Sequence, residues 1–526
     1  MSASLYAGLD SSTQGLTAVV VRVEGRRREV VWRDTVSYDR DLPSYGTRHG
    51  VLAHPDPRVV HAPPLMWVEA LDQLMARMAA GLGSERSRLA MIGGSAQQHG
   101  SVYLNASGLA RLAAPDAASP IAAQLEPGFS RHTSPVWMDA STSEDCAEIE
   151  RALGGPRAAA ALTGSRVYER FTGPQIRRFW RTEPDAYDAT ARVHLVSSFL
   201  ASLLAGRDAP VEPGDGAGMS LMDLSAGAWS ASAVAATAPG LATKLPATAP
   251  SATVIGPLSR YWVDRYAFTP DTRVLAWTGD NPASLIGAGL VGEGRVAISL
   301  GTSDTIFGAM DAPRVSPDGT GHVFGSPAGA FMGISVFRNG SLARERVRDM
   351  FGLDWHGFSR VLRSSPPGNR GGVVLPWFEP EITPIVVRSG WRHRQIDTRD
   401  PAAVIRGVVE GQMLAMARHS RWMGVAIEEI RATGGGSANR ELLHVMADVF
   451  NARVERFDVT NSAALGAALR AMQADTGAAW DDVLPGFVEP IAGGTVEPNP
   501  AAADVYARLA LEAEAFERAE LAHAEQ

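Results

Sequence analysis

The chain opens with alternating apolar and polar segments that predict a small antiparallel sheet. Residues 5–9 are apolar, the polar residues 10–15 (Asp-Ser-Ser-Thr-Gln-Gly) are typical of a turn, and residues 16–23 are rich in β-branched side chains. Three arginines at 26–28 form a second turn ahead of residues 29–32. We expect three consecutive antiparallel strands that begin a mixed sheet.

A similar pattern recurs near residue 300. Residues 295–300 predict a strand, Gly301-Thr302-Ser303-Asp304 a turn, and residues 305–310 a second strand. Two such units, one opening each half, suggest a duplicated α/β domain whose two phosphate loops face each other across a cleft. Two unrelated hairpins would give the same pattern.

Apolar residues recur with the helical period in six further stretches: 67–80, 141–153, 194–204, 341–350, 401–422 and 441–450. Residues 105–135 have the composition of a loop and suggest an insertion over the cleft. Residues 226–257 are rich in Ala, Thr and Pro and lack a strong period. The charged tail, 501–526, predicts a helix on the surface.

The length of 526 residues predicts two large domains, because single cores rarely grow beyond about 300 residues. We place the boundary at the end of the aperiodic stretch. The prediction is one domain over residues 1–257 and a second over 258–526.

Charge and hydropathy narrow the class of partner. The formal net charge is −8 and is spread along the chain, without the basic stripe expected for nucleic acid or an anionic membrane. No signal-like N-terminus and no run of about 18 apolar residues is present, so we expect a cytoplasmic protein that acts on small molecules. Whether the protein forms a homodimer is left open, because an interface cannot be recognised in one sequence.

Cysteine and lysine usage excludes several chemistries. Cys146 is the single cysteine, so a disulfide within the chain and multi-cysteine metal sites are excluded, and its helical context favours a packing role over a nucleophile. Lys244 is the single lysine and follows neither a glycine loop nor a kinase strand. If the protein binds ATP, it does so without a P-loop lysine.

The two Ser/Thr turns could bind phosphate through backbone N–H groups and hydroxyls. Asp10 adds a carboxylate suited to Mg²⁺, usually through water. Each turn taken singly is as well explained by ordinary turn chemistry, because Ser and Thr are common there. The three glycines at 434–436, between a predicted strand and a predicted helix, favour binding of a flat ligand or a phosphate.

Three other polar segments are candidate ligand contacts. Asp280 follows the predicted strand 273–277 and could be a general base, although a turn or N-cap residue would look the same. The cluster Gln97-Gln98-His99 lies between two apolar runs and suits a polyhydroxylated ligand. Arg170 could bind a ligand or form a surface ion pair.

Five segments stand in the order found in the FGGY carbohydrate kinases, and the chain resembles that family over nearly its whole length. They are residues 10–17, 97–100, 279–284, 299–305 and 433–440. Four finer segments resemble the xylulokinase branch, especially its animal type: 136–139, 163–173, 215–219 and 337–342.

The resemblance implies an α/β protein with two actin-like (ribonuclease H-like) domains and a cleft between them where ATP, with Mg²⁺, meets the sugar. It implies that the ketose is bound by His99, Arg170, Asp280 and Asn281, and that Asp280 is also the catalytic base. It implies an ATP site formed by Ser12, Thr13, Gly301, Thr302, Trp355, Gly435, Gly436 and Asn439.

The implied reaction is ATP-dependent phosphorylation of a ketopentose, most simply D-xylulose to D-xylulose 5-phosphate. Pro282 and residues 105–135 depart from bacterial relatives, so another pentulose or polyol, such as ribulose, remains an alternative substrate. A non-catalytic sugar-binding regulator on the same fold is a second alternative, disfavoured by the presence of Asp280 and Thr302. An actin-like chaperone would need a peptide-binding β-domain, which the sequence does not show.

Overall fold

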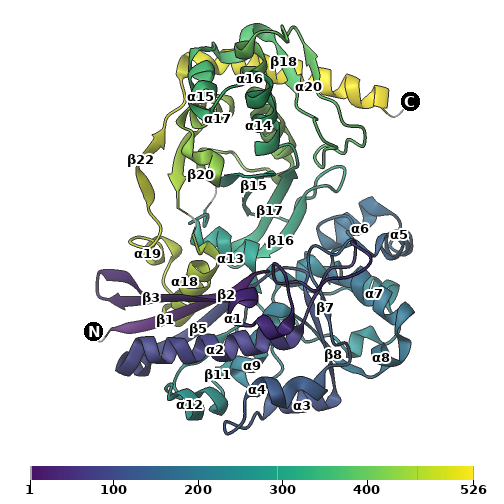
Figure 1. Ribbon diagram of the computed structural model, residues 1–526, viewed down its shortest axis with the longest axis vertical. Coiled ribbons are helices and arrows are strands. Elements are labelled where there is room, and N and C mark those ends of the chain that lie inside the picture. Colours follow the sequence, from purple (N-terminus) through teal and green to yellow (C-terminus); the bar gives the residue numbers. More distant parts are fainter. Residues whose placement is uncertain (1–2, 293, 459, 525–526) are drawn as a thin grey trace. The chain divides into compact units, whose positions relative to one another are not determined.

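The computed structural model describes residues 3–292, 294–458 and 460–524 (Figure 1). The chain forms two compact units. The first comprises Met1–Val291, Val323–Met332 and Thr460–Val488, and the second comprises Gly292–His322, Gly333–Val459 and Glu489–Gln526. The functional boundary predicted at residue 257 stays a prediction.

The first unit is built on a seven-stranded mixed sheet. Its strand order is β11-β12-β5-β1-β2-β3, with β13 paired to β5. β1 pairs antiparallel with β2, and β2 with β3, which confirms the predicted meander; β1 pairs parallel with β5. The bounds are β1 Ser4–Ser11, β2 Gly15–Glu24, β3 Arg27–Ser37, β5 Leu89–Ala96, β11 Val254–Pro257, β12 Arg273–Leu275 and β13 Thr278–Gly279.

Helices cover both faces of this sheet (Figure 1). Leu5, Ala7 and Leu9 alternate along β1 and join the core that includes helix α2 (Pro64–Leu82). Gly8 faces the other way, where a Cβ atom would lie 2.0 Å from the Ala464 carbonyl oxygen of α18 (Ser462–Thr476). A glycine is therefore required at this position, since the helix backbone lies directly on the strand.

A second seven-stranded sheet has the order β16-β17-β15-β14-β20-β21-β22, and its strands β14, β15, β20, β21 and β22 lie wholly in the second unit. β14 pairs antiparallel with β15, as predicted for the second hairpin, and parallel with β20. The buried helix α16 (Pro401–His419) contacts α14, α15 and α17. The other bounds are β14 Arg295–Leu300, β15 Asp304–Met310, β16 His322–Ser326, β17 Gly329–Phe337, β20 Glu429–Thr433, β21 Arg453–Phe457, β22 Pro490–Val496, α14 Ser341–Met350, α15 Trp355–Ser364 and α17 Arg440–Phe450.

All six predicted helices are present, and most of their ends are shifted by one to three residues. α9 (Val196–Ala205) begins two residues later than expected, because Thr190–Leu195 form strand β8, which pairs with β6 (Ser101–Asn105). The pattern over 401–422 ends as a helix at His419 and continues as a 3₁₀ turn, Arg421–Met423.

Two segments expected to be irregular contain helices. Within 105–135, helix α3 (Ala106–Ala113) is capped by Asn105, whose side chain accepts the Gly108 N–H. α4 (Ile121–Leu125) buries Ile121 and Leu125 in the core of the first unit. Within 226–257, α11 (Ala231–Thr237) is capped by Ser230. A short helix needs only one or two apolar residues on its buried face, so these helices leave no clear hydrophobic period in the sequence.

The predicted tail helix is present as α20 (Ala503–Ala524), but its predicted surface position is wrong in part. Tyr506, Leu509 and Ala513 form a buried cluster with Val373 and Leu414. This apolar face anchors the helix to the second unit. Among the described residues, no helix combines the length and apolarity needed to cross a membrane.

Candidate active site

Three parallel strands of the first unit end at the same level and bring two aspartates together. β1 and β13 both run parallel to β5, with Asp10 opposite Ser95 and Gly279 opposite Ala96. Asp280 follows β13 directly, so Asp10 and Asp280 lie at the carboxyl ends of strands that flank β5. In open α/β sheets this edge is where ligands bind.

The two carboxyl groups influence each other. Burial and the charge of Asp280 raise the pKa of Asp10 to about 7, although Ser95 Oγ donates a hydrogen bond of 2.7 Å that opposes the shift. Burial raises the pKa of Asp280 to about 6, against backbone hydrogen bonds from Asn281 and Gln98. A carboxyl group whose pKa lies near neutral pH is suited to accept a proton. Two neighbouring carboxylates are suited to bind a cation.

Asp280 is the first residue of helix α13 (Asp280–Gly287), and the N-cap position is occupied by Gly279. The interpretation of Asp280 as an N-cap is therefore wrong. Gly279 leaves no room for a side chain, since a Cβ atom would lie 2.5 Å from Gln98 Cγ.

Asn281 and Gln98 form a side-chain bridge beside Asp280. Asn281 Nδ2 donates to Gln98 Oε1 at 2.8 Å, and Gln98 Nε2 donates to the Gly214 carbonyl at 3.1 Å. Because Gln98 Nε2 faces the Gly214 carbonyl, Gln98 Oε1 faces Asn281. Asn281 must therefore turn its donor atom, Nδ2, toward Gln98. The polar cluster predicted at 97–99 therefore joins the predicted ligand Asn281.

His99 is buried and neutral. Burial and the charge of Arg170 lower its pKa to about 3. Its Nδ1 lies 2.8 Å from the Gly218 carbonyl oxygen, which can only accept, so Nδ1 carries the proton and Nε2 is an acceptor. A Cβ atom at Gly218 would lie 2.8 Å from Nδ1, which explains a glycine in the segment 215–219. An acceptor nitrogen of this kind suits a sugar hydroxyl.

Arg170 lies close to His99 through a shared aromatic neighbour. The Phe171 ring packs on the imidazole with centroids 4.5 Å apart, and the Arg170 guanidinium lies 5.5 Å from the same ring and 4.9 Å from the Tyr168 ring. Burial lowers the pKa of Arg170, but arginine stays charged at neutral pH.

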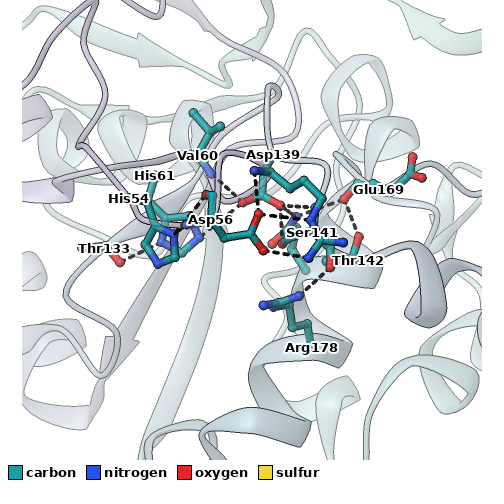
Figure 2. Close-up of polar contacts among 12 residues, drawn as sticks. His54, Asp56, Val60, His61, Thr133, Asp139, Ser141, Thr142, Glu169 and Arg178 are labelled. Carbon is teal, nitrogen blue, oxygen red and sulfur yellow. Dashed lines mark hydrogen bonds and ion pairs between the residues drawn. The ribbon is translucent and has the colours of Figure 1, made fainter.

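The segment that carries Arg170 is held by a buried carboxylate (Figure 2). Asp139 Oδ1 accepts hydrogen bonds from Ser141 and, at 2.7 Å, from Gln175 Nε2. The same Gln175 nitrogen donates to the Glu169 carbonyl at 3.0 Å, and Thr142 Oγ1 donates to that carbonyl at 2.7 Å. Asp139, in a segment that resembles the xylulokinase branch, thus fixes the residue that precedes Arg170.

Ser12 and Thr13 occupy the β1–β2 turn, as predicted. The Ser12 hydroxyl donates to the Gly15 carbonyl at 3.0 Å, and Thr13 Oγ1 accepts a hydrogen bond of 2.8 Å from Trp137 Nε1. These contacts shape the turn. A role of the two hydroxyls in phosphate binding stays a prediction.

The other six predicted ATP residues line one pocket of about 780 Å³ in the second unit. They are Gly301, Thr302, Trp355, Gly435, Gly436 and Asn439. The parallel pairing of β14 with β20 sets Ser299 opposite Thr433, so the turn after β14 and the glycine loop after β20 lie at the same edge of the sheet. The volume is within the usual range for small-molecule sites.

The pocket is lined by the glycine loop after β20 and by an aromatic residue, Trp355. Gly434 adopts a φ of 77°, and a Cβ atom at Gly436 would lie 2.8 Å from Leu300 Cβ, so the loop lies directly against β14. Trp355 is 41% exposed, and the Arg348 guanidinium lies 4.5 Å from its ring. Of the further lining residues, which we did not predict, only Ser341 and its neighbourhood carried a signal, the segment 337–342. These lining residues are Ser341, Arg344, Glu345, His356, Ser359 and Arg363.

Comparisons with known proteins agree with this arrangement. The N-terminal domain of the FGGY family of carbohydrate kinases matches residues 133–287, and the C-terminal domain of that family matches residues 296–474. The chain is 42% identical to xylulose kinase of Rattus norvegicus, over 95% of this chain and 94% of the relative. It is 39% identical to xylulose kinase 2 of Arabidopsis thaliana, over 89% and 87%.

Solved structures show the same fold. The crystal structure of xylulose kinase from Rhodospirillum rubrum matches with a TM-score of 0.83 at 21% identity, over 99% of this chain and 100% of that one. The prediction of an α/β protein with two actin-like (ribonuclease H-like) domains is confirmed. The chain belongs to the FGGY family of carbohydrate kinases.

Proposed function

We propose that this protein transfers the γ-phosphoryl group of ATP to a terminal hydroxyl of a ketopentose, D-xylulose, and so forms D-xylulose 5-phosphate. The observation that carries the proposal is the meeting of Asp10, Asp280, Asn281, Gln98 and His99 at one edge of the first sheet. The relatives named xylulose kinases, at 39 to 42% identity, support the choice of sugar.

In this proposal Asp280 is the general base. Its pKa of about 6 leaves it ionised at neutral pH yet basic enough to take the proton from the hydroxyl that attacks phosphorus. Arg170 donates hydrogen bonds to the sugar, and His99 Nε2 accepts one. Asn281 offers its Oδ1 as a second acceptor, because its Nδ2 donates to Gln98 and Asp280. Directional contacts of both kinds select among polyhydroxylated ligands, because an unmatched buried polar group costs affinity.

ATP is assigned to the pocket of the second unit. Trp355 and the glycines at 435–436 offer flat surfaces to the adenosine. Asn439 is the N-cap of helix α17, and its side chain accepts the Glu441 N–H. The turn at Gly301 and Thr302 binds the terminal phosphates through N–H groups and the hydroxyl. Ser12 and Thr13 are the proposed second phosphate turn.

The residues present fit a magnesium ion that arrives with ATP. In the part of the chain that the structure describes, no three His, Cys, Asp or Glu side chains are grouped to hold a metal by themselves. Mg²⁺ is typically held by one or two carboxylates together with substrate phosphates, and the Asp10 carboxylate, with its raised pKa, is suited to a cation. Asp10, through water, would hold Mg²⁺, which supplies charge that offsets the phosphate oxygens.

We further propose that the enzyme works in the cytoplasm as a monomer or a homodimer and binds neither nucleic acid nor a membrane. The even spread of its −8 net charge supports this proposal. The supply of ATP in that compartment supports the location.

A coupled assay of ADP formation tests the proposed function. D-xylulose should give the highest kcat/KM in a panel with D-ribulose, L-ribulose and pentitols, and phosphorus NMR should identify a 5-phosphate. Sugar binding without ADP formation would instead favour the non-catalytic regulator. A higher kcat/KM for another pentulose would show that the choice of sugar is wrong.

A further inference from the structure

The segment 337–342, which resembles the xylulokinase branch, has no part in the proposed chemistry, yet it lies behind the turn assigned to the terminal phosphates. We call Gly301–Ser303 the phosphate turn. Two contacts tie the segment to it. The Ser341 N–H donates to the Gly301 carbonyl at 2.8 Å, and a Cβ atom at Gly340 would lie 2.6 Å from the Thr302 carbonyl oxygen. The segment therefore packs on the turn without a gap.

A buried ion pair closes the other side of the phosphate turn. Arg344 donates from Nη1 to Asp304 Oδ2 at 2.7 Å and from Nη2 to Asp304 Oδ1 at 2.9 Å, and both side chains are 1% exposed. Asp304 is the residue after the turn, and its carboxylate also accepts a backbone hydrogen bond from Gly301. A two-pronged Arg–carboxylate pair fixes orientation as well as distance.

Buried amides continue this contact into the body of the unit. Arg344 Nη1 donates to Gln412 Oε1 at 3.0 Å, and Gln412 Nε2 donates to the carbonyls of Asn339 and Gly340 at 2.6 and 2.9 Å. Asn339 Nδ2 donates in turn to Glu381 Oε2 at 2.8 Å. The chain of contacts thus runs from Glu381 to the phosphate turn without an interruption.

We propose that Asp304, Arg344, Gln412 and Asn339 form a positioning network that holds the phosphate turn in the geometry needed for phosphoryl transfer. This inference rests on the proposed function. Arg344 lines the nucleotide pocket, but its Nη1 and Nη2 are committed to Asp304 and Gln412 and its charge is matched by a carboxylate. It therefore acts through the turn and not as a cation on the phosphates.

The test uses the full-length enzyme with Gly340→Ala, which places a methyl group against the Thr302 carbonyl oxygen and against the N–H and carboxylate of Asp304, and removes no polar group of the network. Turnover should fall by roughly 10- to 100-fold, because a displacement of about 1 Å can cost that much in an oriented reaction. Affinity for a non-hydrolysable ATP analogue should fall, while affinity for AMP, which lacks the terminal phosphates, stays within about twofold. Gly292→Ala is the matched control, since its nearest atom is the tip of Arg295 at 3.8 Å.

Gln412→Met gives a second variant if Gly340→Ala does not fold, because it keeps the side-chain length and removes both polar ends. The same selective loss is expected. Wild-type turnover in a folded variant, or an equal loss of affinity for AMP and for the ATP analogue, would overturn the inference. The nucleotide measurements need no sugar, so they decide the inference even if the wild-type enzyme phosphorylates no ketose.

Discussion

The two strand–turn–strand units share the residue types Ser, Thr, Gly and Asp in their turns, yet they give their aspartates opposite surroundings. Asp10, at the end of β1, accepts a hydroxyl hydrogen bond from Ser95 and faces the like charge of Asp280. Asp304, at the start of β15, is matched by two hydrogen bonds from Arg344. Burial raises the pKa of both, but only at Asp304 does a guanidinium oppose the shift.

This difference shows how one local pattern can serve two purposes. A carboxylate matched by arginine holds backbone in place and is unavailable for chemistry. A carboxylate beside another carboxylate keeps its capacity to hold a cation or a proton. Asp10 is therefore suited to chemistry, and Asp304 is suited to holding its turn in place.

The largest expected effect is on turnover by Asp280→Asn, which keeps the shape of the side chain and removes the proton acceptor. General-base catalysis typically contributes ~10²- to 10⁴-fold, so kcat at saturating ketose should fall by that factor while the sugar Kd changes little. Asn281→Ala is the matched control, because loss of a binding amide should raise the sugar Kd first. Retention of more than about a tenth of wild-type kcat by Asp280→Asn would make Asp280 a structural residue.

Asp10→Asn should have the next largest effect, and it should appear in the magnesium dependence. Loss of an outer-sphere carboxylate costs about 10- to 100-fold in metal affinity or activity, so the Mg²⁺ concentration for half-maximal rate should rise. The sugar Kd, measured without nucleotide, should not change. An unaltered magnesium titration would remove Asp10 from the proposed metal site.

The pH dependence should report Asp280. Because the base must be ionised and burial raises its pKa to about 6, kcat/KM at saturating Mg²⁺ should be flat above that pH. Below it, the rate should fall about tenfold for each pH unit. A profile whose lower limb lies near pH 4 would mean that Asp280 is better solvated than its burial indicates.

The smallest effect is expected for Cys146→Ala. The thiol is buried against Ile149 and Ala159, and burial raises its pKa, so it is not ionised at neutral pH and has no part in the proposed chemistry. Turnover should stay at the wild-type level with a slight loss of thermal stability. A folded variant without activity would contradict the catalytic assignment.

The sequence was informative where a pattern is local. Both hairpins and the strand before the glycine loop follow from alternation and β-branched runs, and the proposed ATP residues other than Trp355 follow those strands closely in the sequence. The order of the motifs also led to the family.

Partners that are distant in sequence could not be predicted. Gln98 and Asn281 are 183 residues apart, and Asp304 and Arg344 are 40 residues apart, so no periodicity links them. The buried face of α20 was missed for a related reason. Most of its apolar residues are alanines, and charged neighbours such as Arg508 and Glu512 mask the larger ones in the sequence.

Thermal unfolding of Asp10→Asn and Asp304→Asn, compared at pH 8 without Mg²⁺, decides whether the two aspartates differ as described. The folded-state pKa of Asp10, about 7, lies above its ordinary value, so its ionised form at pH 8 disfavours the folded state, and Asn should leave the Tm unchanged or raise it. Asp304→Asn should lower the Tm strongly, because breaking a buried pair costs about 3–5 kcal/mol. A wild-type Tm for Asp304→Asn together with a lowered Tm for Asp10→Asn would contradict the account in which Asp10 serves chemistry and Asp304 holds its turn in place.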